Sequence, residues 1–157
     1  MSIPLAEGDI APKFSLPGDG GDAVALAAFK GRPVALFFYP KDDTSGCTQE
    51  AQEFEALADE FAKIGCVVLG ISPDPLKAHA KFKAKYGLRM NLLSDESKST
   101  LDAYGVWQEK SMYGRKYMGV ERSTFIVGQD GRIAKLWRKV KVPGHAAAVL
   151  EAARSLA

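Results

Sequence analysis

Residues 40–50, PKDDTSGCTQE, hold the side chain best suited to covalent chemistry, the thiol of Cys47. A thiolate is a strong nucleophile, so its surroundings decide whether this cysteine reacts. An apolar run ends at Tyr39 and a helical pattern follows, which puts Cys47 in the first turn of a helix. Unpaired N–H groups and the positive end of the helix dipole there favour a thiolate. We interpret Cys47 as reactive, against the commoner role of a lone cysteine as a small buried side chain.

The apolar runs predict where this helix lies. Buried strands are expected at Val34–Tyr39 and Cys66–Ile71, and the spacing of apolar residues from Ala51 to Ile64 predicts the helix between them, stopped by Gly65. Because Pro40 cannot continue a strand ladder, the chain turns there, and ligands bind at this carboxyl edge of parallel sheets. Cys47 is therefore expected at the functional edge of the sheet.

The rest of the chain alternates strands and helices. We expect strands at Phe14–Leu16 and Val24–Leu26, a helix in 74–87, a strand in 90–95, a short helix in 97–105, a hairpin in 123–138 that turns at Gln129-Asp130-Gly131, and a closing helix in 144–157. This order predicts a three-layer α/β/α sandwich with a central mixed sheet and an N-terminal β-hairpin, as one domain over residues 1–157.

The composition and the absence of recognisable targeting segments narrow the classes of function that we expect for this protein. Net charge is +2 from 21 basic and 19 acidic residues, which gives no case for a nucleic-acid partner. No signal peptide or membrane span is visible, so we expect a cytoplasmic protein with no membrane partner. Its two cysteines are then not expected to form a structural disulfide, and two cysteines and two histidines spread over the chain predict no closed metal site.

Several motifs resemble one family. PKDDTSGC fits the P-x-x-x-T-x-x-C signature of peroxiredoxins, and FFYP, CTQEA, LGISPD, LLSD and ERSTFIVGQDGRI resemble the bacterioferritin-comigratory-protein branch, also called the Q-type. The resemblance runs from about Leu5 to Ala157. It implies a thioredoxin-like fold and a thiol-dependent peroxidase that reduces hydrogen peroxide and organic hydroperoxides in antioxidant defence and redox homeostasis.

The resemblance also implies residue roles. Cys47 would attack the peroxide, Thr44 would offer its hydroxyl to the thiolate and the peroxide, and Pro40 would shield the pocket. Arg122 would hold the thiolate charged and stabilise the leaving oxygen, with Glu50 as its anchor. An always-charged fork of donors beside a rotatable hydroxyl suits this chemistry. Taken singly, Thr44 is also a common N-cap, Pro40 a strand stop and Arg122 an ordinary strand-end residue.

The sequence departs from relatives that carry a resolving cysteine. That position is Gln52 in one pattern and falls near Lys83 in another. Cys66 lies beyond a helix of about 16 residues, roughly 24 Å long, whereas a disulfide needs Cα atoms within about 7 Å. We therefore expect a buried Cys66 and a one-cysteine cycle. An external thiol such as thioredoxin, glutaredoxin or glutathione would resolve it, with an intermolecular bridge through Cys47 or Cys66 as an alternative.

Other interpretations compete with a metal-free, haem-free and flavin-free peroxidase. A thiol–disulfide oxidoreductase would need a second cysteine where Glu50 stands. A redox sensor needs the same reactive thiolate, and turnover would separate it from a peroxidase. A binding module that keeps the fold without the chemistry is disfavoured by the intact set of motif residues. We expect a monomer, with a dimer as the alternative.

Remaining candidates are given structural roles. His79 is expected to be solvated on the lysine-rich helix face Lys77–Lys85, and His145 to serve packing or capping of the last helix. Four large side chains lie in an expected loop before Arg122 and would line the pocket, contact a second subunit or cover the core: Trp107, Met112, Tyr113 and Tyr117.

Overall fold

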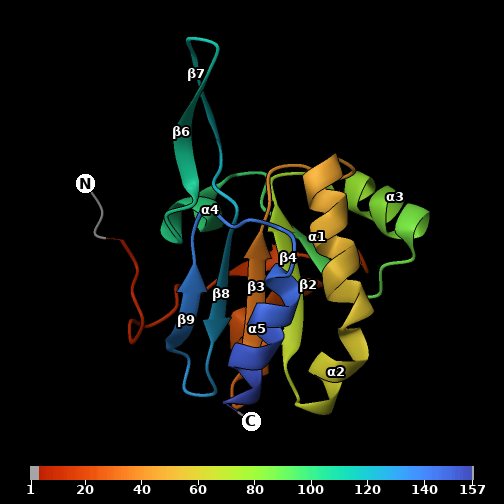
Figure 1. The fold of residues 1–157 in the computed structure, drawn as a ribbon, viewed down its shortest axis with the longest axis vertical. Helices are drawn as coiled ribbons and strands as arrows, with labels where there is room; N and C mark the ends of the chain where they lie inside the picture. The colour runs from red at the N-terminus through yellow and green to blue at the C-terminus, as the bar shows by residue number, and fades with distance from the viewer. Residues whose placement is uncertain (1–3, 157) are drawn as a thin grey trace.

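The computed structural model describes residues 4–156. At its centre lies a five-stranded sheet in the order β5-β4-β3-β8-β9 (Figure 1). Strands β3, β4 and β5 run parallel, whereas β8 is antiparallel to β3 and β9 is antiparallel to β8. The strands are β3 (Val34–Phe38), β4 (Val67–Ser72), β5 (Asn91–Ser94), β8 (Ser123–Val127) and β9 (Ile133–Trp137). The predicted mixed sheet is confirmed.

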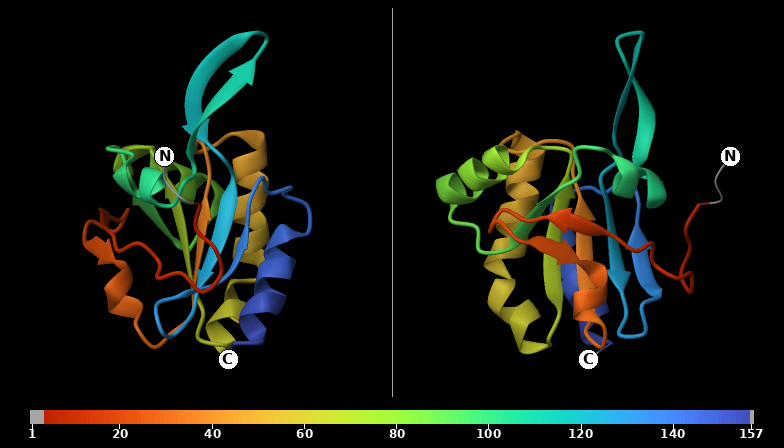
Figure 2. Two further views of the ribbon diagram at one scale, coloured as in Figure 1. Left: turned by 90° about the vertical axis from the view of Figure 1, so that its left-hand side faces the viewer. Right: turned by 180° about the vertical axis from the view of Figure 1, so that it is seen from behind.

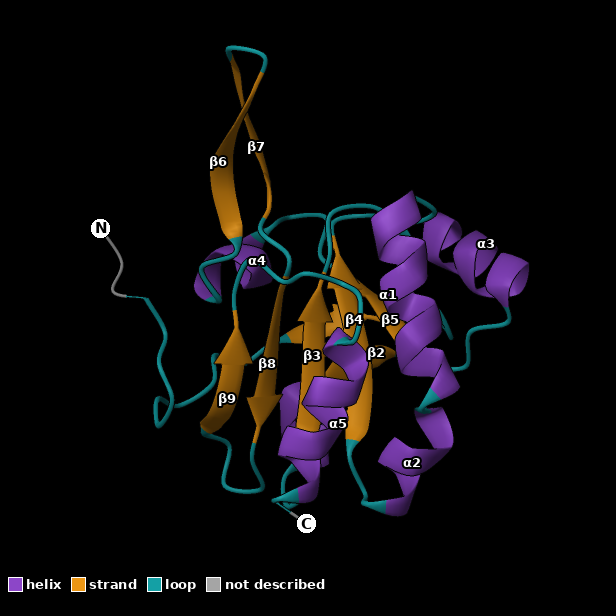
Figure 3. Cartoon of the chain, in the orientation of Figure 1, coloured by secondary structure: helices purple, strands orange, loops and turns teal. Residues whose placement is uncertain are grey.

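The other elements surround this sheet (Figures 1 and 3). The predicted N-terminal hairpin is present, and each of its two strands is shifted by one residue from the predicted range. The elements are β1 (Ser15–Pro17), β2 (Ala23–Ala25), the 3₁₀ turn η1 (Leu26–Phe29), α1 (Ser45–Ala56), α2 (Ala58–Lys63), α3 (Leu76–Tyr86), α4 (Ser99–Ala103), β6 (Trp107–Met112), β7 (Arg115–Val120) and α5 (His145–Arg154). No helix among the described residues is long and apolar enough to cross a membrane.

Strand β3 is buried on both faces because two apolar clusters flank the sheet. All five of its residues are at most 1% exposed. One cluster joins Phe37 to Phe54 of α1, Phe82 of α3 and Val149 of α5, and the other joins Phe38 to Tyr104 and the N-terminal segment. Figure 2 shows α1 and α5 on one side of the sheet, with the N-terminal segment and α4 on the other. This double cover explains the uninterrupted apolar run in the sequence.

The expected single helix up to Ile64 is interrupted. At Leu57 the backbone has φ −103° and ψ 8°, and α2 starts at the next residue. The Leu57 N–H bonds to Phe54 three residues back rather than four. The spacing could not reveal this break, because Leu57 itself continues the apolar pattern. Gly65, at φ +69°, ends α2 as predicted.

The prediction of a loop before Arg122 is wrong. Residues 107–120 instead form a two-stranded hairpin that projects from the body (Figure 1). Tyr113 and Gly114 lie between the strands with φ +51° and +77°. Two central residues with positive φ are the mark of a tight hairpin turn whose twist matches the strands. The available signal was Gly114, because glycine favours the positive φ of such a turn.

Candidate active site

The loop between β3 and α1 carries Cys47 to the carboxyl edge of the parallel strands. Strand β3 ends at Phe38, Tyr39 and Pro40 lead out of the sheet, and α1 starts at Ser45. Cys47 therefore lies in the first turn of α1, as predicted, and is 2% exposed. It lies three residues after the N-cap Thr44 of this 12-residue helix, where a helix presents free N–H groups and the positive end of its dipole.

Arg122 connects the two polar groups at this helix start. Its Nη2 donates to Cys47 Sγ at 3.3 Å, and its Nη1 donates to Glu50 Oε1 at 2.7 Å. Arg122 lies just before β8, which pairs with β3, so the sheet register brings together residues 75 positions apart. The guanidinium is thus fixed at two points, with one donor aimed at the sulfur.

Glu50 is the buried carboxylate that faces this guanidinium. It is 1% exposed, and its Oε2 is buried without a hydrogen-bond partner. Burial raises the pKa of Glu50 to about 7, although Arg122 opposes the shift. For Arg122 burial disfavours the charge, but Glu50 and Cys47 outweigh it and raise the pKa of the guanidinium.

Thr44 and Pro40 border the same loop without reaching the sulfur in this state. Thr44 occupies the N-cap position of α1, yet its side chain makes no capping bond. Its Oγ1 donates to Lys41 O at 2.8 Å, and no hydrogen bond found in residues 4–156 joins it to Cys47. Pro40 is half-buried where the chain leaves β3. The structure thus joins Cys47, Arg122 and Glu50 directly and leaves Thr44 and Pro40 in the loop beside them.

Gly46 is a feature that the sequence reasoning missed. A Cβ atom placed on it would lie 3.2 Å from Arg122 Nη2. The guanidinium therefore rests against the bare backbone of α1, and any side chain at this position would push on the group that binds the sulfur. The only signal for this contact in the sequence was that Gly46 directly precedes the nucleophile Cys47.

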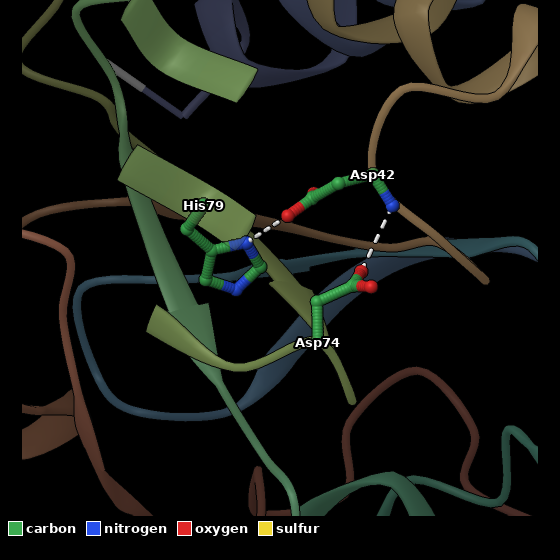
Figure 4. Close-up of side chains that lie close together, drawn as sticks. All are labelled: Asp42, Asp74 and His79. Carbon is green, nitrogen blue, oxygen red and sulfur yellow. Dashed lines mark hydrogen bonds and ion pairs between the residues drawn. The ribbon is translucent and has the colours of Figure 1, made fainter. Parts of the chain in front are cut away.

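His79 is not solvated as expected but fully buried. Its Nδ1 lies 2.6 Å from Asp42 Oδ2, and its Nε2 lies 3.0 Å from the Leu93 carbonyl oxygen. Figure 4 shows this pair together with Asp74, whose carboxylate accepts the backbone N–H of Asp42 at 2.9 Å. The missed signal is spacing, because His79 shares a helical face with the buried Phe82 three residues later.

The same three side chains could be considered as metal ligands. One ligand atom from each of Asp42, Asp74 and His79 lies within 4.8 Å of the others. Both ring nitrogens of His79 are already in hydrogen bonds, and Asp74 Oδ2 accepts from Ser72 Oγ at 2.6 Å. Both ring nitrogens of His79, both carboxylate oxygens of Asp42 and Asp74 Oδ2 are therefore already occupied in one hydrogen-bond network.

A cavity of about 450 Å³ opens beside Arg122 at the base of the projecting hairpin. Its lining is polar and charged rather than aromatic, and consists of Gln108, Glu109, Lys110, Glu121, Arg122, Lys139 and Val140. Trp107 is partly buried and packs against the core, which was one of the three roles expected for it. Met112, Tyr113 and Tyr117 are 56%, 98% and 43% exposed, so they do not cover the core.

The remaining cysteine and histidine are both buried, and burial was the expectation for Cys66. Cys66 is 4% exposed just before β4, and burial raises the pKa of its thiol to about 11. His145 opens α5 and lies 2.8 Å from Thr124 Oγ1. Burial lowers the pKa of His145 to about 4, so the ring is neutral.

The chain is similar to known proteins over most of its length. The profile of the AhpC/TSA family matches residues 8–136. The chain is 49% identical over 150 residues to "Putative peroxiredoxin bcp" of Coxiella burnetii, covering 96% of this chain and 98% of that protein. It is 44% identical to "Peroxiredoxin Bcp" of Bacillus subtilis, covering 95% of each.

Two solved structures are similar over most of the chain. A mutant of Xanthomonas campestris peroxiredoxin Q superimposes with a TM-score of 0.88 at 44% identity, covering 92% of each chain. A mutant of Xylella fastidiosa PrxQ gives a TM-score of 0.91 at 37% identity, covering 98% of each chain.

Proposed function

The chain belongs to the peroxiredoxins of the Bcp/Q branch in the AhpC/TSA family, and from this we propose that it is a thiol-dependent peroxidase in which Cys47 attacks the peroxide with Arg122, Thr44 and Pro40 around it. The contact of Arg122 Nη2 with Cys47 Sγ at 3.3 Å carries the proposal. A fixed cation beside the sulfur favours the thiolate that peroxide reduction requires.

The first step follows from these groups. The Cys47 sulfur attacks the terminal peroxide oxygen, an S–O bond forms, and the O–O bond breaks. The leaving oxygen takes up one proton as water or an alcohol, and Cys47 becomes a sulfenic acid. Arg122 would stabilise charge on the leaving oxygen, because its donors are already held in place by Glu50. Thr44 would exchange its bond to Lys41 O for one to the peroxide, since a hydroxyl rotates freely.

The second half of the cycle is proposed to use an external thiol. One thiol condenses with the sulfenic acid, releasing water and forming a mixed disulfide, and a second thiol frees Cys47. Cys66 lies at the far end of α1 and α2, and the 12 residues of α1 alone rise about 18 Å. That separation supports a one-cysteine cycle over a bridge within one chain.

Substrate, reductant and setting complete the proposal. A structure of the Xanthomonas campestris bacterioferritin comigratory protein concerns its alkyl peroxide reduction activity, and organic hydroperoxides are proposed for this chain beside hydrogen peroxide. Thioredoxin, glutaredoxin and glutathione are the thiols proposed as reductants, in a reducing cytoplasm. A monomer is expected, which sedimentation analysis would check.

A stopped-flow experiment tests the proposal. We expect hydrogen peroxide or an alkyl hydroperoxide to change tryptophan fluorescence through Cys47 at a rate orders of magnitude above that of free cysteine, with Cys47→Ser as the blank. Arg122→Gln should slow the reaction by about 100-fold or more, the usual cost of losing one such donor. Arg115→Gln, on exposed β7, is the matched control and should react like the parent. A parent rate equal to free cysteine for both peroxides would refute the proposal.

A further inference from the structure

The loop that carries Cys47 into α1 is held at Asp42 by partners from three segments. The Tyr39 hydroxyl, just after β3, donates to Asp42 Oδ1 at 2.5 Å. Asp74, between β4 and α3, accepts the Asp42 backbone N–H, and His79 of α3 meets Asp42 Oδ2 at 2.6 Å. Both carboxylate oxygens and the backbone of this one residue are therefore fixed.

The Asp42–His79 contact is an ion pair that water does not reach. His79 Nε2 faces the Leu93 carbonyl, which can only accept, so Nε2 carries a hydrogen. With Nδ1 facing a carboxylate as well, the ring is assigned as a doubly protonated imidazolium. The side chains are 0% and 4% exposed. Burial by itself lowers the pKa of His79, but the bonds to Asp42 and Leu93 outweigh it and raise the pKa.

The loop needs such a hold because its backbone is strained. Asp43, the next residue, has φ +60°, a left-handed conformation that is uncommon outside glycine. Its carboxylate reaches α3 too, through Tyr86 and Lys85, but on the exposed surface, where such contacts are weak. The buried pair at Asp42 is thus the main link that keeps the chain reversed before α1 begins at Ser45.

We propose that His79 is a positioning residue for Cys47, because it fixes Asp42 and with it the loop 40–44 that sets where α1 begins and where Cys47 meets Arg122. The inference rests on the proposed peroxidase function for its consequence in turnover. His79 contacts Asp42, Leu93 and Tyr39 rather than the sulfur, so it acts through the loop.

Two tyrosines provide a matched test. Tyr39 and Tyr104 are both buried, and each hydroxyl donates one hydrogen bond, to Asp42 in one case and to Pro12 O in the other. Tyr39→Phe removes the bond to Asp42 together with the 3.5 Å contact to His79 Nδ1, whereas Tyr104→Phe removes the bond to Pro12 O. We expect Tyr39→Phe to slow oxidation of Cys47 by about 5-fold, the equivalent of one hydrogen bond, and Tyr104→Phe to leave it within about 2-fold.

Two substitutions of His79 give the larger effect. His79→Leu leaves the Asp42 carboxylate buried without its partner, and we expect a loss of about 10- to 100-fold in the second-order rate of Cys47 oxidation, the scale of a small displacement of a reacting group. His79→Asn retains an N–H near the position of Nδ1 and should recover part of this loss. If His79→Leu does not fold, His79→Asn and the tyrosine pair decide the matter.

A second readout is independent of peroxide. The rate of Cys47 alkylation by iodoacetamide at pH 7.5 reports how the sulfur is held beside Arg122, and this rate should fall in His79→Leu and Tyr39→Phe. The proposal is overturned if folded His79 variants match the parent in both readouts, or if Tyr104→Phe changes them as much as Tyr39→Phe. A parent that alkylates normally but does not reduce peroxides would refute the peroxidase function alone.

Discussion

Around Cys47, charge and burial compete most clearly at Glu50. One of its carboxylate oxygens accepts from Arg122, and the other is buried with no partner among residues 4–156. An ionised carboxylate is costly in such a place even with a guanidinium beside it. The protonation of Glu50 should therefore change near neutral pH, with a measurable effect on the free energy of unfolding.

The pH dependence of stability follows from the sign of this shift. The pKa of Glu50 rises from 4.5 in the unfolded chain to about 7 in the fold, so the folded state holds the proton more tightly. Its contribution is complete below pH 4.5 and is lost as the pH rises through 7. Relative to Glu50→Gln, which does not titrate there, the parent should lose about 1–3 kcal/mol of unfolding free energy between pH 5 and 8.

Urea unfolding of both proteins at pH 5, 6.5 and 8 measures this difference. Every other titrating group is common to the two proteins and cancels to first order. A difference in unfolding free energy that stays constant over this range would show that Glu50 keeps an ordinary acidity in the fold.

Helix α1 places the nucleophile, and the chemistry depends on how closely its first turn approaches Arg122. Gly46 permits that approach, because the Nη2 that donates to Cys47 lies 3.2 Å from where a Cβ would be. Arg122 cannot readily move aside, since Glu50 and the sulfur hold it at two points. Stability and reactivity should therefore respond in opposite directions to a side chain here.

Gly46→Ala tests this separation at the level of the helix. Alanine is favoured over glycine in helices by up to about 1 kcal/mol, so thermal stability should be unchanged or slightly higher. The added methyl group should displace the guanidinium and lower the rate of Cys47 oxidation by about 10-fold or more. Thermal unfolding and stopped-flow oxidation on one preparation give both numbers. An unchanged oxidation rate would mean that the contact has no bearing on the reaction.

Over the whole molecule, the two cysteines are kept apart by the direction of the chain. Cys47 follows the carboxyl end of β3, and Cys66 precedes the start of β4. Because the two strands are parallel, the cysteines lie at opposite ends of this strand pair. Cys66 is also deprived of its reactivity, because burial raises the pKa of its thiol to about 11.

Labelling of the two thiols should show this division. In the native protein at pH 7.5 we expect iodoacetamide to modify Cys47 at least about 100-fold faster than Cys66, since almost no Cys66 thiolate is present. After unfolding in urea the two rates should converge. Peptide mass spectrometry after timed quenching gives the ratio. Comparable labelling in the native state would contradict the inert role of Cys66 and reopen a bridge that involves it.

The sequence by itself determined the features that depend on neighbours along the chain. Two-sided burial of β3 shows as an unbroken apolar run, and the strand–loop–helix order places Cys47 at a helix start. Gly65 marked a helix end, because a positive φ suits glycine there. The family resemblance named Arg122 and Glu50, which the fold then brings together.

Only the tertiary structure decided which distant groups meet. The Asp42–His79 pair spans 37 positions, and its histidine looks solvated in a lysine-rich stretch until α3 is packed on the sheet. The position of Arg122 against Gly46 likewise depends on the antiparallel register of β8 on β3. Local patterns record burial and turns, whereas contacts between segments are set by how the sheet and helices pack, which no single stretch of sequence encodes.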